Sequence, residues 1–249
     1  MVILKQPAEI DKIRASNRIV AEVLAVLQEK VKAGITTLEL DRIAEEMTLR
    51  RGAKPAFKGY RGYPFSLCAS VNEEIIHGLP SKRVLADGDI VGLDFGVYCK
   101  GYYGDAALTV PVGNISPEAG LLLKATEESL ALAIDAARVG NRVGDISAAV
   151  QNHVEAAGYA VVRDFVGHGI GRNLHEEPQI PNFGVKGRGV ALKAGMVLAI
   201  EPMVNAGSYR VKIRSDGWTA VTADGRLSAH FEHTVAITEN GPEILSRCH

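Results

Sequence analysis

Two aspartates, Asp94 and Asp105, lie in a segment that otherwise has the composition of an apolar β-hairpin. If the turn is a two-residue loop at Cys99 and Lys100, positions that sum to 199 face each other, and the aspartates become direct cross-strand partners with Cβ atoms roughly 5 Å apart. Any loop of even length keeps both carboxylates on one face. Like charges opposite each other destabilise a sheet, and burying an unpaired carboxylate costs more. A divalent cation would resolve this conflict, and the apolar flanking residues argue against a solvated edge hairpin.

Three further polar side chains stand inside apolar runs. Glu201 follows the apolar residues 196–200, and Glu232 precedes an apolar strand pattern. His168 stands between two glycines, whose missing side chains allow another group to approach the imidazole closely. Four carboxylates and one imidazole suit two divalent first-row ions bridged by carboxylates better than a tetrahedral structural zinc. Each residue alone has an ordinary interpretation as an ion pair or a core histidine, but five in one chain favour a metal site.

Two other histidines, His77 and His175, are not needed to complete a carboxylate-bridged metal pair, so each could contact substrate instead. His230 shares the predicted face of Glu232, and it either orients that carboxylate or is a polar core residue. Familiar nucleotide and hydrolase motifs are absent. The glycine-rich stretch around His168 has Arg172 where a dinucleotide fingerprint needs glycine, no Walker lysine follows a glycine cluster, and the sequence has no Gly-x-Ser-x-Gly elbow.

The bulk composition is that of an ordinary globular protein. The chain has 249 residues, 47% of them hydrophobic and 23% charged, with a formal net charge of −1. Without a run of Lys or Arg, it lacks the basic patch expected of a protein that binds nucleic acid or anionic membranes. No stretch approaches the ~18 apolar residues of a membrane span, and the first residues are too briefly apolar for a signal peptide. Three unpatterned cysteines, Cys68, Cys99 and Cys248, predict free thiols and a cytoplasmic protein.

Hydrophobic periodicity predicts a repeated pair of helices. The first pair spans residues 7–32 and, with Thr37 as N-cap, 37–52; the second spans 117–139 and 144–158. Gly34 and Gly140, like Gly52 and Gly158, are 106 positions apart. We therefore expect an internal duplication within a single domain, and a cleft between the halves would be a natural active site. The predicted strands span residues 70–76, 90–97, 102–112, 160–165, 196–204, 218–222 and 230–238.

The ordered motifs of this chain resemble those of the type I methionine aminopeptidases, from the first helix to Glu243. They are His77-Gly, Leu93-Asp94, Gly104-Asp105, Gly167-His168-Gly-Ile-Gly171, His175-Glu176-Glu-Pro, Ile200-Glu201-Pro and Phe231-Glu232-His-Thr. The resemblance implies an α/β (α+β) pita-bread fold, with two pseudo-symmetric halves, an antiparallel sheet and outer helices. It implies one catalytic domain over residues 1–249, with pseudo-repeats of about 1–115 and 116–249, as in the short prokaryotic form.

The resemblance also implies a cofactor and its ligands. Two divalent ions would be held, with Asp94 giving two oxygens to one of them. Asp105 and Glu232 would bridge both ions, and His168 and Glu201 would bind the other. Co, Mn, Fe, Ni and Zn could all occupy such a site. Asn72 and Ser228 match positions near a monovalent-cation site.

Catalytic and substrate-binding roles follow from the same resemblance. His175 would contact the scissile carbonyl or its oxyanion, and His77 the peptide next to the cleaved bond. Glu201 would accept a proton from the attacking water as well as bind metal. The implied methionine pocket is lined by Tyr60, Tyr63, Cys68, Trp218 and Leu174, the last at a position where many members have phenylalanine.

The implied function is metal-dependent removal of the N-terminal methionine from nascent proteins and peptides when the second residue is small. The expected partner is the N-terminal segment of a nascent polypeptide, with transient ribosome association, a monomeric state, and no membrane or nucleic acid. An X-Pro aminopeptidase or prolidase is the nearest alternative, but such enzymes usually carry an additional N-terminal domain. A non-catalytic peptide-binding module with the same fold is a further alternative, and the intact ligand set argues against it.

Overall fold

The computed structural model describes residues 2–247, so Cys248 lies outside the described residues. Its helices are α1 (Pro7–Lys30), α2 (Thr37–Arg50), α3 (Pro117–Ala136) and α4 (Val143–Ala156), with a short 3₁₀ turn η1 (Tyr60–Gly62). All four predicted helices are confirmed, within three residues at their ends. The N-cap of α2 is Thr36 and not Thr37, because the Thr36 side chain accepts from the Glu39 N–H while the Glu39 carboxylate accepts from the Thr36 N–H, a capping box.

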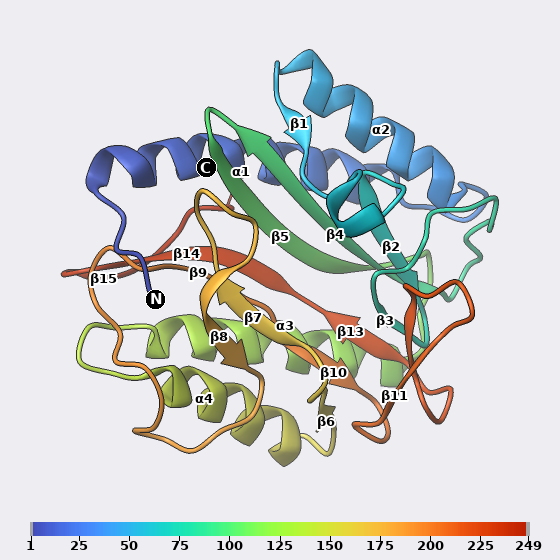
Figure 1. Cartoon of the computed structure of the whole chain (residues 1–249). Helices are drawn as coiled ribbons and strands as arrows, with labels where there is room; N and C mark the ends of the chain where they lie inside the picture. The colour runs from blue at the N-terminus through green and yellow to red at the C-terminus, as the bar shows by residue number, and fades with distance from the viewer. Residues whose placement is uncertain (1, 248–249) are drawn as a thin grey trace.

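The main sheet has nine strands, and all its pairings are antiparallel. Its central path runs β1-β4-β5-β14-β9-β7-β8, with β2 paired to β4 and β15 to β14. The strands are β1 (Lys54–Pro55), β2 (Leu67–Val71), β4 (Ile90–Cys99), β5 (Tyr102–Pro111), β7 (Val166–Gly169), β8 (Glu176–Pro181), β9 (Val197–Ile200), β14 (Glu232–Thr238) and β15 (Gly241–Ile244). In Figure 1, α1 and α2 lie above the sheet and α3 and α4 below it. This arrangement of a curled sheet and outer helices is the pita-bread α/β fold.

Two small sheets complete the fold, with orders β13-β10-β6 and β11-β12-β3. Their strands are β3 (Glu74–Ile76), β6 (Ala160–Val161), β10 (Met203–Asn205), β11 (Val211–Ile213), β12 (Ala220–Thr222) and β13 (Ser228–His230). Three strands predicted as continuous are therefore wrong, and the strand predicted over residues 160–165 ends at Val161. Residues 230–238 divide at Phe231, between β13 and β14. Residues 70–76 divide at Asn72, whose φ of 59° turns the chain, and residues 196–204 divide at Pro202, which has no N–H to donate to a strand partner.

The β4–β5 hairpin differs from the predicted register by two positions. Its two-residue turn is Lys100-Gly101, both at positive φ (52° and 86°), and Cys99 pairs with Tyr102. Glycine adopts positive φ without a steric penalty, so this turn is favoured over Cys99-Lys100. Asp94 consequently pairs with Ala107, and Asp105 with Gly96. The aspartates are diagonal neighbours and not direct partners, but the even loop length keeps them on one face, as predicted.

Each helix pair covers its own part of the sheet with a separate apolar cluster. Residues of α1 and α2 pack on β2, β4 and β5 around the fully buried Phe95, while residues of α3 and α4 pack on β9 and β14. Gly34 and Gly140 have φ values of 96° and 95°, and each precedes a second helix. We propose that the two pairs descend from one duplicated unit within a single domain, as the 106-residue offset predicts.

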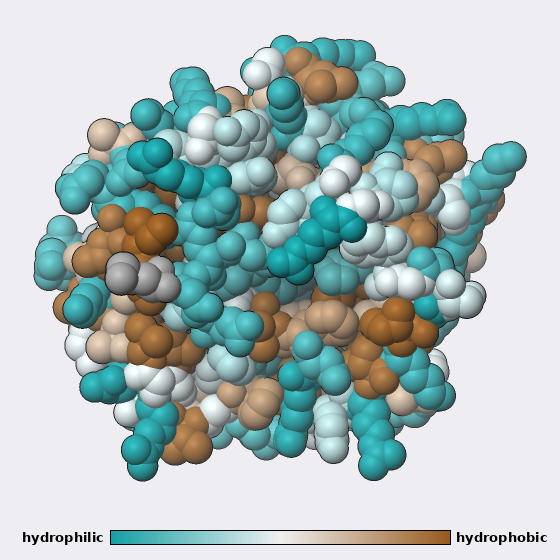
Figure 2. Space-filling view, in the orientation of Figure 1, coloured by the Kyte–Doolittle hydropathy of each residue, from teal (hydrophilic) through white to brown (hydrophobic). Residues whose placement is uncertain are grey.

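The surface is chemically mixed. Figure 2 shows small groups of apolar side chains distributed among polar ones on the face that Figure 1 presents. Among the residues that the structure describes, no helix is both long and apolar enough to cross a membrane.

Candidate metal centre and substrate pocket

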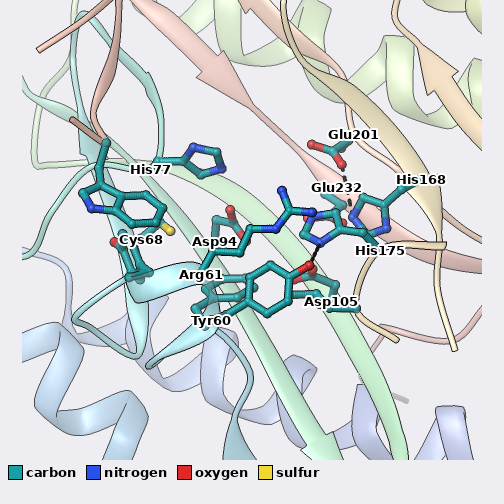
Figure 3. A pocket seen from close by; sticks show the side chains of 14 residues that line it. Tyr60, Arg61, Cys68, His77, Asp94, Asp105, His168, His175, Glu201 and Glu232 are labelled. Carbon is teal, nitrogen blue, oxygen red and sulfur yellow. Dashed lines mark hydrogen bonds and ion pairs between the residues drawn. The ribbon is translucent and has the colours of Figure 1, made fainter. Parts of the chain in front are cut away.

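Five neighbouring strands of the main sheet each position one predicted metal ligand. Across the order β4-β5-β14-β9-β7 these are Asp94 on β4, Asp105 on β5, Glu232 at the start of β14, Glu201 directly after β9, and His168 on β7. Strand pairing fixes the alignment, because Glu232 faces Ala107 on β5 and His168 faces Ala199 on β9. The sheet therefore gathers side chains from positions 94 to 232 at one place, as Figure 3 shows.

The ligand atoms lie close together, and two of them have no hydrogen-bond partner. Donor atoms of Asp105, His168 and Glu232 lie within 4.8 Å of one another, and each residue is at most 7% exposed. His168 Nε2 is 3.5 Å from Glu201 Oε1. Asp105 Oδ1 and Glu232 Oε1 are buried without a hydrogen-bond partner. Buried charges in proteins are normally paired or coordinate metals, so these orphaned oxygens fit divalent cations.

The electrostatics of the ligand set lead to the same conclusion. Burial raises the pKa of Asp94 to about 7. Burial, followed by repulsion from neighbouring carboxylates, raises the pKa values of Asp105, Glu201 and Glu232 well above the ordinary range. Burial lowers the pKa of His168 to about 3, so this imidazole is neutral near pH 7 and keeps a lone pair for a metal. Cations between the carboxylates would stabilise their ionised forms.

His230 lies beside Glu201 and not beside the carboxylate suggested by its sequence position. Its Nε2 is 3.7 Å from Glu201 Oε2, has no hydrogen-bond partner and is buried. His233 instead bonds Ser246 Oγ through Nδ1 at 2.8 Å. We propose that His230 orients Glu201. Strand parity alone could not suggest this pair, because it relates His230 only to its own strand neighbours.

His175 stands beside the metal ligands with its orientation fixed by Tyr60. The Tyr60 hydroxyl is 2.8 Å from His175 Nδ1, and the His175 ring centre is 4.3 Å from that of His168. Burial, together with the positive charge of Arg61, lowers the pKa of His175 to about 4. The imidazole is thus neutral near pH 7. If Nδ1 accepts from Tyr60, the proton resides on Nε2, which can donate to a substrate oxygen.

An apolar wall adjoins the ligand cluster. Cys68 on β2 pairs with Asp94 on β4, so the wall and the metal site share neighbouring backbone. The Tyr63 hydroxyl donates to the carbonyls of Leu67 and Gly78, and the Tyr63 ring meets Trp218 edge-on with centroids 5.2 Å apart. These contacts hold the aromatic side chains in place.

One cavity of about 170 Å³ unites the metal ligands and the predicted substrate residues. The predicted residues that line it are Tyr60, Tyr63, Cys68, His77, Asp94, Asp105, His168, Leu174, His175, Glu201, Trp218 and Glu232. His77 enters from the end of β3 with a φ of 57°, and its ring contacts Phe165 edge-on. Every side chain proposed for the site therefore reaches the same cavity.

Two lining residues, Phe57 and Arg61, were not predicted. A Cβ on Gly96 would lie 2.7 Å from the Phe57 ring, so this glycine allows Phe57 to pack on β4. Arg61 has a φ of 50° and lies between Gly59 and Gly62, at 86° and 91°. The two glycines flanking Tyr-Arg are the sequence signal for this loop, but they do not indicate where its side chains point.

Asn72 and Ser228 are also brought together. The Ser228 N–H donates to the Asn72 carbonyl at 2.9 Å. The Asn72 amide donates to Asp89 Oδ1 at 2.8 Å and accepts from the Ile90 N–H at 3.0 Å. We propose, as the resemblance implies, that a monovalent cation binds near this junction.

The chain belongs to metallopeptidase family M24, whose model matches residues 11–239. It is 61% identical to the methionine aminopeptidase of Clostridium perfringens, over 99% of both chains. It is 53% identical to methionine aminopeptidase 1 of Bacillus subtilis, over 99% of this chain and 100% of the relative. Among solved structures, the methionine aminopeptidase of Thermotoga maritima superposes with a TM-score of 0.98 at 48% identity, covering all of both chains.

Solved structures with other names are less similar. The prolidase of Pyrococcus furiosus superposes with a TM-score of 0.80 at 24% identity, and the match covers 99% of this chain but 66% of that one. At this identity the similarity shows the fold alone.

Proposed function

We propose that this chain is a metal-dependent aminopeptidase that removes the N-terminal methionine from peptides and nascent proteins whose second residue is small. The observation that carries the proposal is the meeting of five metal ligands with an apolar, aromatic and thiol-lined wall in one cavity. Full-length relatives at 53–61% identity, all named methionine aminopeptidase, support the same activity.

The five ligands would hold two divalent cations, with Asp105 and Glu232 between them. When bound, such cations lower the pKa of a water molecule and polarise a carbonyl oxygen. The identity of the ions is open among Co, Mn, Fe, Ni and Zn, because oxygen and imidazole donors accept all of them.

The remaining steps fall to side chains of this chain. Glu201 accepts the proton of the attacking water, because its carboxylate reaches the cavity and would be ionised while the cations are bound. His175, with Nδ1 held by Tyr60, donates from Nε2 to the carbonyl oxygen as negative charge develops there. His77, which also lines the cavity, contacts the peptide beyond the cleaved bond.

The apolar wall selects the first residue. Tyr63, Cys68 and Trp218, together with Leu174 and Tyr60, favour a flexible thioether through dispersion and sulfur–aromatic contacts. Discrimination against leucine or norleucine by such a pocket is modest, on the order of 1–3 kcal/mol. Charged first residues are rejected more strongly, since their burial would be uncompensated.

The setting of the reaction is part of the same proposal. The chain would act as a monomer in the cytoplasm on emerging N-termini, with transient ribosome association. The X-Pro alternative is not favoured, because X-Pro aminopeptidase of Thermotoga maritima is 23% identical and this chain covers 64% of it. A non-catalytic module is not favoured either, because all five ligand positions are filled by metal-binding residue types.

Mass spectrometry of two peptides after incubation with manganese-loaded protein tests this function. Met-Ala peptide should lose its first residue, and Met-Lys peptide should stay intact. Equal hydrolysis of Lys-Ala or Xaa-Pro peptides would instead indicate a broader peptidase, and no hydrolysis of any peptide would indicate a binding module.

A further inference from the structure

Arg61 is a charged side chain at the cavity mouth that the proposed catalytic roles leave unused. It lines the cavity together with His77 and His175, yet the residue is exposed to solvent. In Figure 3 its side chain extends across the front of the pocket toward His175.

The backbone holds Arg61 in this position. Its φ of 50° lies in the left-handed region, which is unfavourable for a side chain longer than Asn or Asp. Hydrogen bonds close the loop on both sides, from the Gly59 N–H to the Tyr63 carbonyl at 2.7 Å and from the Tyr63 N–H to the Tyr60 carbonyl at 2.9 Å. The guanidinium carbon lies 5.4 Å from the Tyr60 ring centre, a cation–π contact. The loop thus presents a positive charge beside the tyrosine that orients His175.

No carboxylate neutralises this charge among residues 2–247. Lys58, three positions earlier, binds Glu45 at 2.7 Å, whereas Arg61 takes part in none of the ion pairs of the described chain. Within the cavity the other charged side chains are the four carboxylates of the metal site. Two divalent cations would balance those four negative charges. The guanidinium of Arg61 would then give the cavity mouth a net positive charge.

We propose that Arg61 is a specificity-determining residue that favours substrates with an acidic side chain at the third position. This inference rests on the proposed function. In the proposed function the side chain of the first residue fills the apolar wall, its carbonyl lies at the metal site beside His175, and the second residue lies beside His77. The chain then leaves through the mouth, so the third side chain is the one that meets the guanidinium. A carboxylate there gains a charge-assisted hydrogen bond, and an ammonium group is repelled.

Three amidated peptides, Met-Ala-Glu-Ser, Met-Ala-Gln-Ser and Met-Ala-Lys-Ser, test the proposal with the manganese-loaded protein. The amide removes the terminal carboxylate, which would otherwise compete for Arg61. We expect kcat/KM to fall in the order Glu, Gln, Lys, with about a tenfold span at low ionic strength that arises in KM. The span should shrink toward twofold in 0.5 M salt, because an exposed charge is screened.

Two variants and one control separate the outcomes. Arg61→Gln should abolish the preference and Arg61→Glu should reverse it, as judged by the ratios of kcat/KM among the three peptides within each variant. Lys58→Gln, which removes a neighbouring charge that is already paired, should leave the preference unchanged. Equal kcat/KM for the three peptides in the parent, or a preference that persists in Arg61→Glu, would overturn the inference. If the parent protein cleaves none of the three peptides, that result would instead overturn the proposed function.

Discussion

Two groups of buried carboxylates in this molecule differ in what neutralises them. Glu176 is bound by the Lys5 ammonium at 2.7 Å and by the Asn173 N–H at 3.1 Å, and the side chains of the ion pair are 3% and 5% exposed. Asp105 and Glu232 are equally buried, but each leaves a carboxylate oxygen without a partner.

The difference separates structural from functional acids. Glu176 carries its counter-charge within the chain, so its pairing stabilises the fold whatever is dissolved around it. Asp105 and Glu232 surround a cavity and need their counter-charge from solution. Removing Lys5, the partner of Glu176, should therefore lower the stability of the fold. Removing Asp105 or Glu232 should instead lower catalytic activity.

The largest expected effect is on catalysis, in Asp105→Asn. Loss of a bridging carboxylate should lower kcat by about 10³-fold or more, since metal assistance is worth several kcal/mol. The fold should remain, because the change also removes repulsion among the acids. Kinetics with Met-Ala-Ser and a thermal melt check both parts, and a variant with full activity without added metal would refute the bridging role.

The matching effect on stability comes from Lys5→Met. It leaves Glu176 buried without its cation, and we expect the free energy of unfolding to fall by about 3–5 kcal/mol. Lys58→Met, which breaks the exposed pair with Glu45, is the control and should change stability by less than about 1 kcal/mol. Urea unfolding measures both. Equal losses in the two variants would remove the distinction between these pairs.

His175→Ala should lower kcat by about 10²-fold, the scale of losing one oxyanion donor. Metal content, measured by elemental analysis, should not change, because the five ligands are complete without His175. Tyr60→Phe should cause a smaller loss of kcat, since it removes the hydrogen bond that orients the His175 ring but leaves that ring in place. Loss of bound metal in His175→Ala would reassign this residue as a ligand.

A further expected effect is the pH dependence of metal-free stability. The ligand carboxylates have raised pKa values in the folded state, so the folded chain binds more protons than the unfolded chain, and stability falls as pH rises. Histidines with lowered pKa values, such as His168 and His230, oppose this trend only below about pH 6.5. The chelated protein should therefore lose stability from pH 6.5 to 8, measured by urea unfolding. Manganese should abolish the slope; an identical slope with metal present would contradict this.

Much of the site could be predicted from sequence because acids inside apolar strands violate the ordinary burial pattern. That signal marks a residue but not its neighbours across the sheet. The hairpin register was wrong by two, although Gly101 offered a better turn position than Cys99. The proximity of His230 to Glu201 depends on pairing between β13 and β10, which local pattern does not encode.

The loop residues were the least predictable. Arg61 enters the cavity from the backbone turns at Gly59 and Gly62, whereas Phe57 packs where Gly96 leaves room for its ring. No periodic pattern exists there to indicate the direction of a side chain. The N-terminal contact of Lys5 with Glu176 joins positions 171 residues apart, for which a single sequence carries no signal.

The most direct test of the account is a metal titration of chelated protein, with turnover of Met-Ala-Ser and bound manganese measured in the same samples. The account predicts negligible turnover in the metal-free protein and recovery as manganese binds, with two ions per chain at saturation. Turnover that is unchanged at a metal content near zero would contradict it.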